Sequence, residues 1–467
     1  MSVDLTPPHE LRAAFARAMS QRYAVEVPAY QTLVDVCLAI NTEAVESGTY
    51  DGSVGSVGRI TEERHGAIRV GSPAELRDVA RLFGLLGMHP VGFYDLREAA
   101  ARSVPVVSTA FRPVDPDDLD RNAFRVFTSM LVPADRRFFD ADTQREIEAR
   151  VAARDLLPAG LREQLDVAEQ RGGVPVDEAE AFVALAVRTF ELDRQPLDAA
   201  FYDHLATISS VAADIGAEPG THINHLTPRV LDIDELYARM QALGITMIDR
   251  IQGPPRWDGP LVLLRQTSFR ALDEVRAMRL ADGRVVQRPL RVRFGEVEAR
   301  GVALTPEGRQ RYDDLLAATD AELAETPGAS YQQLAEPRFA AELPDDQRGL
   351  ARAGLAYHSY RAARPVADTG GAARSVDALL AGGHLDVSPI VYEDFLPKSA
   401  AGIFQSNLTS EGTRHDADAT HQDAASLAEA MQREVLDPYA LYAAQQQASL
   451  HAALAQLGLD PEQVAGA

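Results

Sequence analysis

Two stretches of the chain, "HGAIRVGSPAEL" at residues 65–76 and "HLTPRVLDIDEL" at residues 225–236, carry the same pattern. Each has histidine at the first position, arginine at the fifth, valine at the sixth and leucine at the twelfth. In both, a strand-like start turns at a capping residue into an amphipathic helix that ends at a glycine, Gly87 or Gly244. Another apolar strand is then predicted, "MHPVGFYDL" or "ITMIDRI". The repeated order indicates two copies of a β-α-β-β-β module.

The composition narrows the possible functions. The 467 residues include 46 Lys and Arg against 69 Asp and Glu, a formal charge of −23. Such a surface repels phosphate backbones, so we expect no nucleic-acid partner, and a small acidic substrate needs a local arginine pocket. Cys37 is the only cysteine, which excludes an internal disulfide and cysteine-bound zinc or iron–sulfur clusters, and its apolar helix face predicts a core position. The chain shows neither a signal-peptide pattern nor about 20 consecutive apolar residues, so we expect a soluble, cytoplasmic protein with no membrane partner.

The two repeats predict a metal site. If the modules pair their sheets about a pseudo-twofold axis, the first residue of each opening strand, His65 or His225, points into the shared concavity. In "RVRFGEVEARG" the strand alternation puts Phe294, Glu296 and Glu298 on one face, so either glutamate can supply a carboxylate. Two histidines and one carboxylate form a three-ligand face that leaves positions open on Fe(II) for a substrate and O₂. The same ligands also bind Mn, Co or Zn, so they do not select iron by themselves.

Two neighbouring residues compete for places in this site. His222 precedes His225 by three residues and therefore faces the opposite side of a regular strand. We favour His225 as the ligand because it aligns with His65 in the repeat. Glu298 shares a face with the other glutamate, and its alternative role is to accept a hydrogen bond behind the ligands or to pair with Arg300.

Four segments carry a resemblance to a known family: "RHGAIR", "HINHLTPRVLDID", "RFGEVEARGVALT" and "PIVYEDFLPKSAAGIFQSNL". Together they resemble the 2-oxoadipate dioxygenase/decarboxylase (2-hydroxyglutarate synthase) family of the vicinal oxygen chelate superfamily, from about residue 10 to about residue 445. In addition, "FGEVEAR" is similar to the Phe–x–Glu–x–x–x–Arg pattern of hydroxyphenylpyruvate dioxygenase-like members, which points to Glu296 as the ligand.

The resemblance implies an oxidoreductase that uses Fe(II) to convert 2-oxoadipate and O₂ into 2-hydroxyglutarate and CO₂ in lysine degradation. It implies that His65, one histidine of "HINH" and Glu296 hold the iron, with no catalytic residues beyond these metal ligands. Arg69, four residues after His65, would bind the distal carboxylate of the 2-oxo dicarboxylate, for which arginine offers two parallel N–H donors. The "PKSAAG" segment would close the other side of the substrate pocket with Ser399 and Lys398, although family members more often have a small apolar residue at the position of Lys398.

We expect an α+β fold in which the paired β-α-β-β-β modules surround the metal site and helical segments wrap them. Within the second module, "PLVLLRQTSFRA" and "RPLRVRFGEVEARGVAL" are both predicted as strand. The expected parts are an N-terminal helical segment (1–50), the first module (51–135), a helical insertion (136–217), the second module (218–305), and a C-terminal helical and loop region that closes the active site (306–467).

Two other functions fit the same residues. A redox-inert lyase or isomerase on this scaffold, with Zn or Mn, would turn over without O₂. A binding protein that sequesters a small acid would need no metal, and Glu296→Gln would leave its affinity unchanged. The joint presence of His65, Arg69, His225 and Glu296 argues against simple binding, which requires no three-ligand face.

Overall fold

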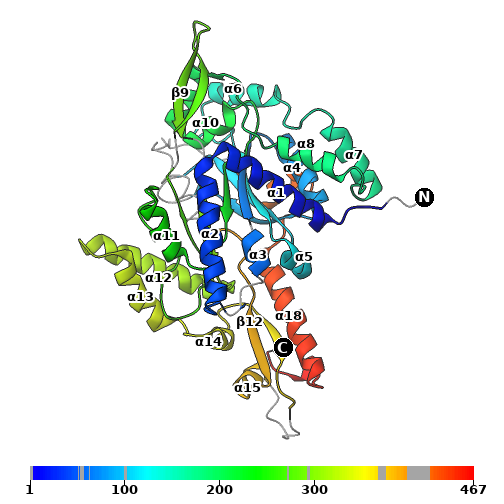
Figure 1. Ribbon diagram of the computed structural model, residues 1–467, viewed down its shortest axis with the longest axis vertical. Helices are drawn as coiled ribbons and strands as arrows, with labels where there is room; N and C mark the ends of the chain where they lie inside the picture. Colours follow the sequence, from blue (N-terminus) through cyan, green and yellow to red (C-terminus); the bar gives the residue numbers. More distant parts are fainter. Residues whose placement is uncertain are drawn as a thin grey trace.

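The computed structural model describes residues 4–50, 52, 57–62, 64–98, 103–270, 273–291, 295–366, 375–396 and 421–466. The predicted site residues Lys398 and Ser399 lie outside these residues. Figure 1 shows an elongated molecule, with the hairpin of β8 (Asp273–Arg279) and β9 (Val285–Arg291) projecting at one end. Among the described residues, no helix combines the length and the apolar character that a membrane span requires.

The first predicted module supplies four of the five strands of the central sheet. The Ser72 side chain accepts a hydrogen bond from the backbone N–H of Glu75 and so caps the helix where the chain leaves the first strand. Gly87 follows that helix with a φ of 68°, a left-handed conformation that glycine adopts without strain. The first strand pairs parallel with the fourth, and the other neighbours pair antiparallel. The elements keep the predicted order: β1 (Arg64–Val70), α4 (Pro73–Leu85), β2 (His89–Asp95), β3 (Val106–Arg112) and β4 (Arg125–Leu131).

The second module joins the first through its opening strand, which pairs with β1 in the central sheet. It contains β6 (His225–Pro228), α11 (Ile233–Ala242), β7 (Leu264–Ser268) and β10 (Glu296–Arg300). β6 pairs antiparallel with β1, which completes a five-stranded sheet of order β2-β3-β4-β1-β6. A parallel bridge between Arg229 and Glu298 places β10 beside the end of β6, just as β4 lies parallel to β1. The two modules therefore have the pseudo-twofold relation that the repeat predicts, within an α+β fold.

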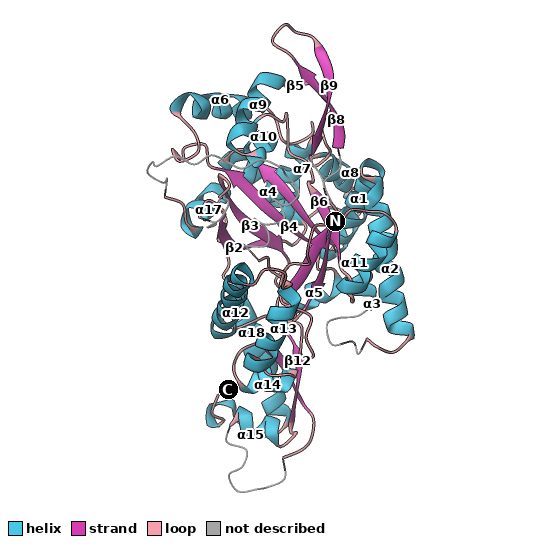
Figure 2. Cartoon of the chain, turned by 90° about the vertical axis from the view of Figure 1, so that its left-hand side faces the viewer, coloured by secondary structure: helices cyan, strands magenta, loops and turns pink. Residues whose placement is uncertain are grey.

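Two strand predictions in the second module were wrong in extent. Residues 245–251, "ITMIDRI", form no strand. Met247 makes an isolated bridge with Phe269, and Gln252, just after this segment, makes another with Gln266. The stretch "RPLRVRFGEVEARGVAL" is not one strand. Its first part belongs to β9, which forms a separate sheet with β8 and β5 (Leu197–Asp198), whereas β10 pairs with β7. The hairpin is therefore an insertion between β7 and β10 that projects away from the central sheet (Figure 2).

Helical segments cover the rest of the molecule. The N-terminal helices are α1 (Pro8–Glu26) and α2 (Pro28–Glu46), followed by the short α3 (Val57–Glu62), and α5 (Pro116–Arg121) precedes β4. Between β4 and β6 lie α6 (Ala141–Ala152), α7 (Leu161–Arg171), α8 (Ala179–Arg188), α9 (Ala199–Ile208) and α10 (Ser210–Gly216). After β10 come α12 (Pro306–Glu325), α13 (Tyr331–Glu342), α14 (Gln347–Arg352), α15 (Val376–Ala381), α17 (Ala424–Met431), α18 (Pro438–Gln456) and the 3₁₀ turn η1 (Pro461–Gln463). This last region, predicted as helix and loop, also contains a hairpin of β11 (His358–Ala362) and β12 (Leu385–Pro389).

The largest hydrophobic core ties the N-terminal helices to the first module. Phe15 of α1 packs edge-on against Phe83, Phe124 and Phe190, with ring centroids 5.8 to 6.3 Å apart. Cys37 of α2 is only 3% exposed in the same core, as predicted. Removing one buried phenylalanine side chain typically costs 3–5 kcal/mol, so these contacts hold α1 firmly against the module that carries β1.

Candidate metal centre

The register of β1 and β6 brings the two histidines of the repeat together. His65 lies opposite Thr227, and Ala67 lies opposite His225. Residues two apart on a strand share a face, so both histidines project from the same side of the sheet. Their rings are 5.6 Å apart and nearly perpendicular, and both side chains are at least 95% buried.

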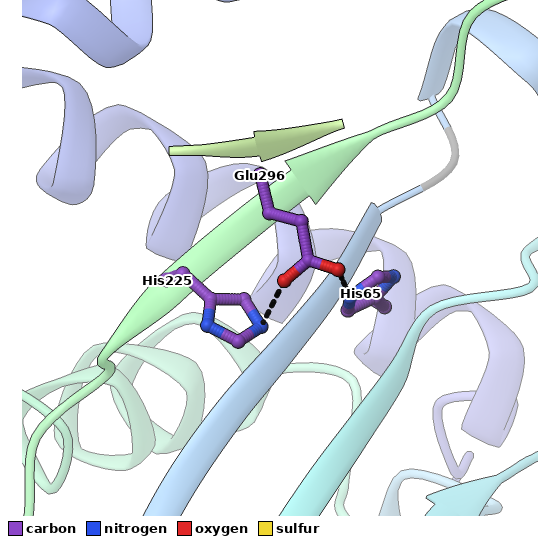
Figure 3. Close-up of side chains that lie close together, drawn as sticks. All are labelled: His65, His225 and Glu296. Carbon is purple, nitrogen blue, oxygen red and sulfur yellow. Dashed lines mark ion pairs between the residues drawn. The ribbon is translucent and has the colours of Figure 1, made fainter. Parts of the chain in front are cut away.

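Glu296, the first residue of β10, points its carboxylate between the two imidazole rings (Figure 3). Its Oε1 lies 3.8 Å from Nε2 of His65, and its Oε2 lies 3.3 Å from Nε2 of His225. One donor atom from each residue lies within 4.8 Å of the others. Atoms that each bind one ion at about 2.1 Å lie at most about 4.2 Å apart, a limit that both carboxylate–imidazole distances meet. The widest separation in the set, at most 4.8 Å, would close by a few tenths of an ångström around a divalent cation, which two imidazoles and a carboxylate suit chemically.

Burial gives these three groups unusual acid–base properties. Burial raises the pKa of Glu296 well above its ordinary value, and the nearby negative charge of Glu298 raises it further. Burial also lowers the pKa of His65, and it lowers the pKa of His225 well below the usual value of 6.5. Without a cation, burial therefore favours the neutral form of each of the three side chains. A bound cation offsets that cost, because neutral imidazoles and an ionised carboxylate are its natural ligands.

Glu298 occupies a different position from Glu296, although the two share a strand face. Its Oε1 lies 3.1 Å from Nδ1 of His65, on the side of the ring away from Glu296. Arg125 donates to both of its carboxylate oxygens at 3.0 Å, and Arg300 donates to Oε1 at 2.7 Å. Burial alone would raise its pKa, but the two arginines and His65 hold the pKa of Glu298 well below the ordinary value. The ion pair predicted between Glu298 and Arg300 is confirmed, and the Glu298 carboxylate lies behind the His65 ring, where its other predicted role requires it.

The structure separates His222 from this donor set. Its Nε2 lies 3.0 Å from the amide nitrogen of Asn224 and 3.5 Å from a carboxylate oxygen of Asp214. Asp214, on α10, also accepts a hydrogen bond from Nη1 of Arg69 and one of 3.1 Å from Asn224. Arg69 is four residues after His65 on β1 and therefore projects from the same strand face. The predicted substrate-binding arginine is thus buried beside the histidine pair and tied to a carboxylate.

Sequence reasoning missed three side chains at the centre. The Phe395 ring packs edge-on against the His65 ring at 5.0 Å, and the guanidinium of Arg125 lies over the same Phe395 ring at 4.6 Å. Asp214 is the third. Phe395 stands inside the quoted "PIVYEDFLPKSAAG" segment, which was the one signal for it. No local pattern pointed to the other two, because each meets the site through a contact between distant parts of the chain.

A buried set of two histidines and a glutamate, placed where two β-α-β-β-β modules meet, has the donor composition of a divalent-metal centre. Comparison with known proteins narrows the class. A family model described as 2-oxoadipate dioxygenase/decarboxylase matches residues 15–407. The chain belongs to the 2-oxoadipate dioxygenase/decarboxylase family, which confirms the resemblance drawn from its sequence.

Several relatives cover almost the whole chain. A 2-oxoadipate dioxygenase/decarboxylase of Mycobacterium tuberculosis is 51% identical over 434 residues, 93% of this chain and 95% of the relative. One of Pseudomonas putida is 40% identical over 469 residues, 98% of each chain. The crystal structure of the hydroxyglutarate synthase from Pseudomonas putida in complex with 2-oxoadipate aligns with a TM-score of 0.81 at 38% identity, covering 98% of this chain and 100% of that chain. The protein is therefore an enzyme of this family, and the family's dioxygenase chemistry implies a metal.

Proposed function

We propose that this protein is a non-haem Fe(II)-dependent dioxygenase/decarboxylase that converts 2-oxoadipate and O₂ to 2-hydroxyglutarate and CO₂, a step of lysine catabolism in the cytoplasm. The observation that carries the proposal is the buried convergence of His65, His225 and Glu296. The description of the family and the 2-oxoadipate complex of the Pseudomonas putida relative support the choice of substrate. The single cysteine, reduced and buried, is in keeping with a cytoplasmic site of action.

In this proposal His65, His225 and Glu296 hold the iron. Fe(II) held by these three residues would supply the Lewis acidity that binds a 2-oxo acid and the redox chemistry that activates O₂. The protein keeps both imidazoles neutral at neutral pH, because burial lowers the pKa of each histidine. Phe395, 6% exposed and packed on the His65 ring, excludes bulk water from that side of the ligands.

Arg69 is proposed to bind the distal carboxylate of the substrate. Four strand residues span about 13 Å, a distance that a six-carbon diacid held at the ligands and an arginine side chain together bridge. The hydrogen bond to Asp214 orients the guanidinium, whose planar fork suits a carboxylate. Ser399 and Lys398, outside the described part of the chain, are proposed to close the other side of the pocket.

The test is O₂ uptake by protein loaded anaerobically with Fe(II), on addition of 2-oxoadipate, with CO₂ and 2-hydroxyglutarate assayed in the same samples. We expect equal amounts of O₂ consumed and of each product formed, and loss of all three in His225→Ala. His222→Ala is the matched control for iron content, because His222 is equally buried but outside the donor set. Metal-loaded protein that consumes no O₂ would refute the proposal and favour a redox-inert enzyme on the same scaffold.

A further inference from the structure

A network of buried charges stands directly behind His65. Glu298 lies between Nδ1 of His65 and the guanidinium groups of Arg125 and Arg300. Arg300 also donates to Glu393, which is 3% exposed. His65, Glu298, Arg125 and Arg300 are each at most 3% exposed, so water does not compete for these hydrogen bonds.

The position of Glu298 determines which nitrogen of His65 carries the proton. A neutral imidazole has one N–H group, and a carboxylate that already accepts from two guanidinium groups offers only acceptor oxygens. An oxygen of Glu298 lies 3.1 Å from Nδ1, and its negative charge favours the N–H group at that nitrogen. The lone pair is then on Nε2, the nitrogen that faces Glu296 at 3.8 Å. This tautomer is the one that a metal ligand at Nε2 requires.

The surrounding arginines hold Glu298 in this place. Arg125 binds both oxygens of the carboxylate, and Arg300 binds Oε1 from two residues further along the same strand. Rotation of the Glu298 side chain toward the donor set would break these charge-assisted hydrogen bonds and remove one buried carboxylate from two buried guanidinium groups. One strand face thus supplies both the carboxylate in front of the His65 ring and the carboxylate behind it.

We infer that Glu298 is a positioning residue, which holds His65 in the Nδ1-protonated tautomer and in the ring orientation that presents Nε2 to the metal. The inference rests on the proposed metal site of His65, His225 and Glu296. It assigns to Glu298 no contact with the metal or the substrate. In known metalloproteins, loss of such a partner lowers metal affinity by roughly 10–100-fold.

The experiment measures Co(II) affinity, by chelator competition, for the wild type and for Glu298→Gln, Glu298→Asp and Glu393→Gln. The glutamine has one acceptor oxygen for which Arg125 and Arg300 compete, so its amide N–H₂ turns to Nδ1 and favours the wrong tautomer. We expect the affinity to fall about 10–100-fold in Glu298→Gln and by an intermediate factor in Glu298→Asp, which keeps the charge. Glu393→Gln removes a buried charge from the same arginine network without touching His65, and we expect it to stay within about threefold of the wild type.

A second readout is independent of metal. Imidazole nitrogen spectra of metal-free protein labelled with ¹⁵N-histidine should contain an Nδ1-protonated signal that disappears in His65→Ala and changes tautomer in Glu298→Gln. Wild-type affinity in both Glu298 variants, or equal losses in Glu298→Gln and Glu393→Gln, would overturn the positioning role. Unchanged Co(II) binding by His65→Ala would instead refute the proposed metal site itself, so the two failures are distinguishable.

Discussion

Replacing Arg69 with methionine tests substrate recognition and buried-charge energetics in one variant. Methionine keeps a long, flexible apolar side chain but removes the guanidinium, which is 96% buried and donates to Asp214. Hydrogen bonds to a charged group contribute about 1.5–3 kcal/mol, and each 1.4 kcal/mol is a factor of ten. We therefore expect kcat/KM for 2-oxoadipate to fall about 10–100-fold. The value for 2-oxohexanoate, which has a methyl group in place of the distal carboxylate, should stay nearly unchanged.

The same variant should lose stability, because Asp214 is left buried without its cation. Breaking a buried ion pair from one side costs about 3–5 kcal/mol. We expect about 3 kcal/mol, since Asn224 still donates to the Asp214 carboxylate at 3.1 Å. Adding Asp214→Asn removes the orphaned charge and should recover most of that loss in the free energy of unfolding.

Steady-state kinetics with both substrates and denaturant unfolding of both variants separate the two effects. The double variant should be stable again and still fail to distinguish 2-oxoadipate from 2-oxohexanoate. An equal drop in kcat/KM for the two substrates in Arg69→Met would refute the assignment of Arg69 to the distal carboxylate. Recovery of selectivity in the double variant would refute it as well.

Three further outcomes are expected. Burial lowers the pKa of His358 to about 4 from an unfolded value of 6.5, so its contribution to stability is complete above pH 6.5 and is lost as the pH falls toward 4. Between pH 7.5 and pH 5 the wild type should lose about 2 kcal/mol of unfolding free energy relative to His358→Gln, and parallel pH curves for the two would contradict this. A Cβ at Gly301 would lie 1.8 Å from the carbonyl oxygen of Leu261, so Gly301→Ala should lower the free energy of unfolding by about 3 kcal/mol in a denaturant titration. Gly220→Ala is the control and should be near neutral, because a Cβ there has no atom within 4 Å. Equal effects of the two substitutions would show that the backbone at Gly301 shifts to relieve the clash. Co(II) at 100 times its dissociation constant should raise the unfolding free energy by about 2.7 kcal/mol, and an equal gain in His225→Ala would place the ion elsewhere.

Local patterns in the sequence were enough to predict the order of elements in the first module, the opening strand and helix of the second, and the pair of histidines. The capping residue Ser72, the terminal Gly87 and the helical spacing of apolar residues act over one or two turns, so they are readable without the fold. Placing His65 and His225 together needed one further assumption, that equivalent strands of two modules pair at a pseudo-twofold axis. The antiparallel pairing of β1 with β6 meets that assumption.

The ends of the strands in the second module were predicted less well from the sequence. One apolar and charged stretch was predicted as a single strand, yet β9 and β10 belong to different sheets. Alternation alone cannot show where a chain leaves one sheet for another, because both halves keep the same period of two. For the same reason the segment before β7 has strand-like composition but only two bridges.

By itself, the sequence determined the module type, the histidine pair and the family, because these reside in short segments whose residue types and spacing suffice. Strand alternation left Glu296 and Glu298 equivalent, since both lie on one face of one strand, and only the family resemblance pointed to Glu296. The tertiary structure supplies the physical distinction between them. It set Glu296 against two Nε2 atoms and surrounded Glu298 with arginines, one of them 173 residues away in the chain. It likewise brought Asp214 to Arg69 across 145 residues. A side chain's role depends on what it meets, and contacts over such separations arise only when the sheets pack.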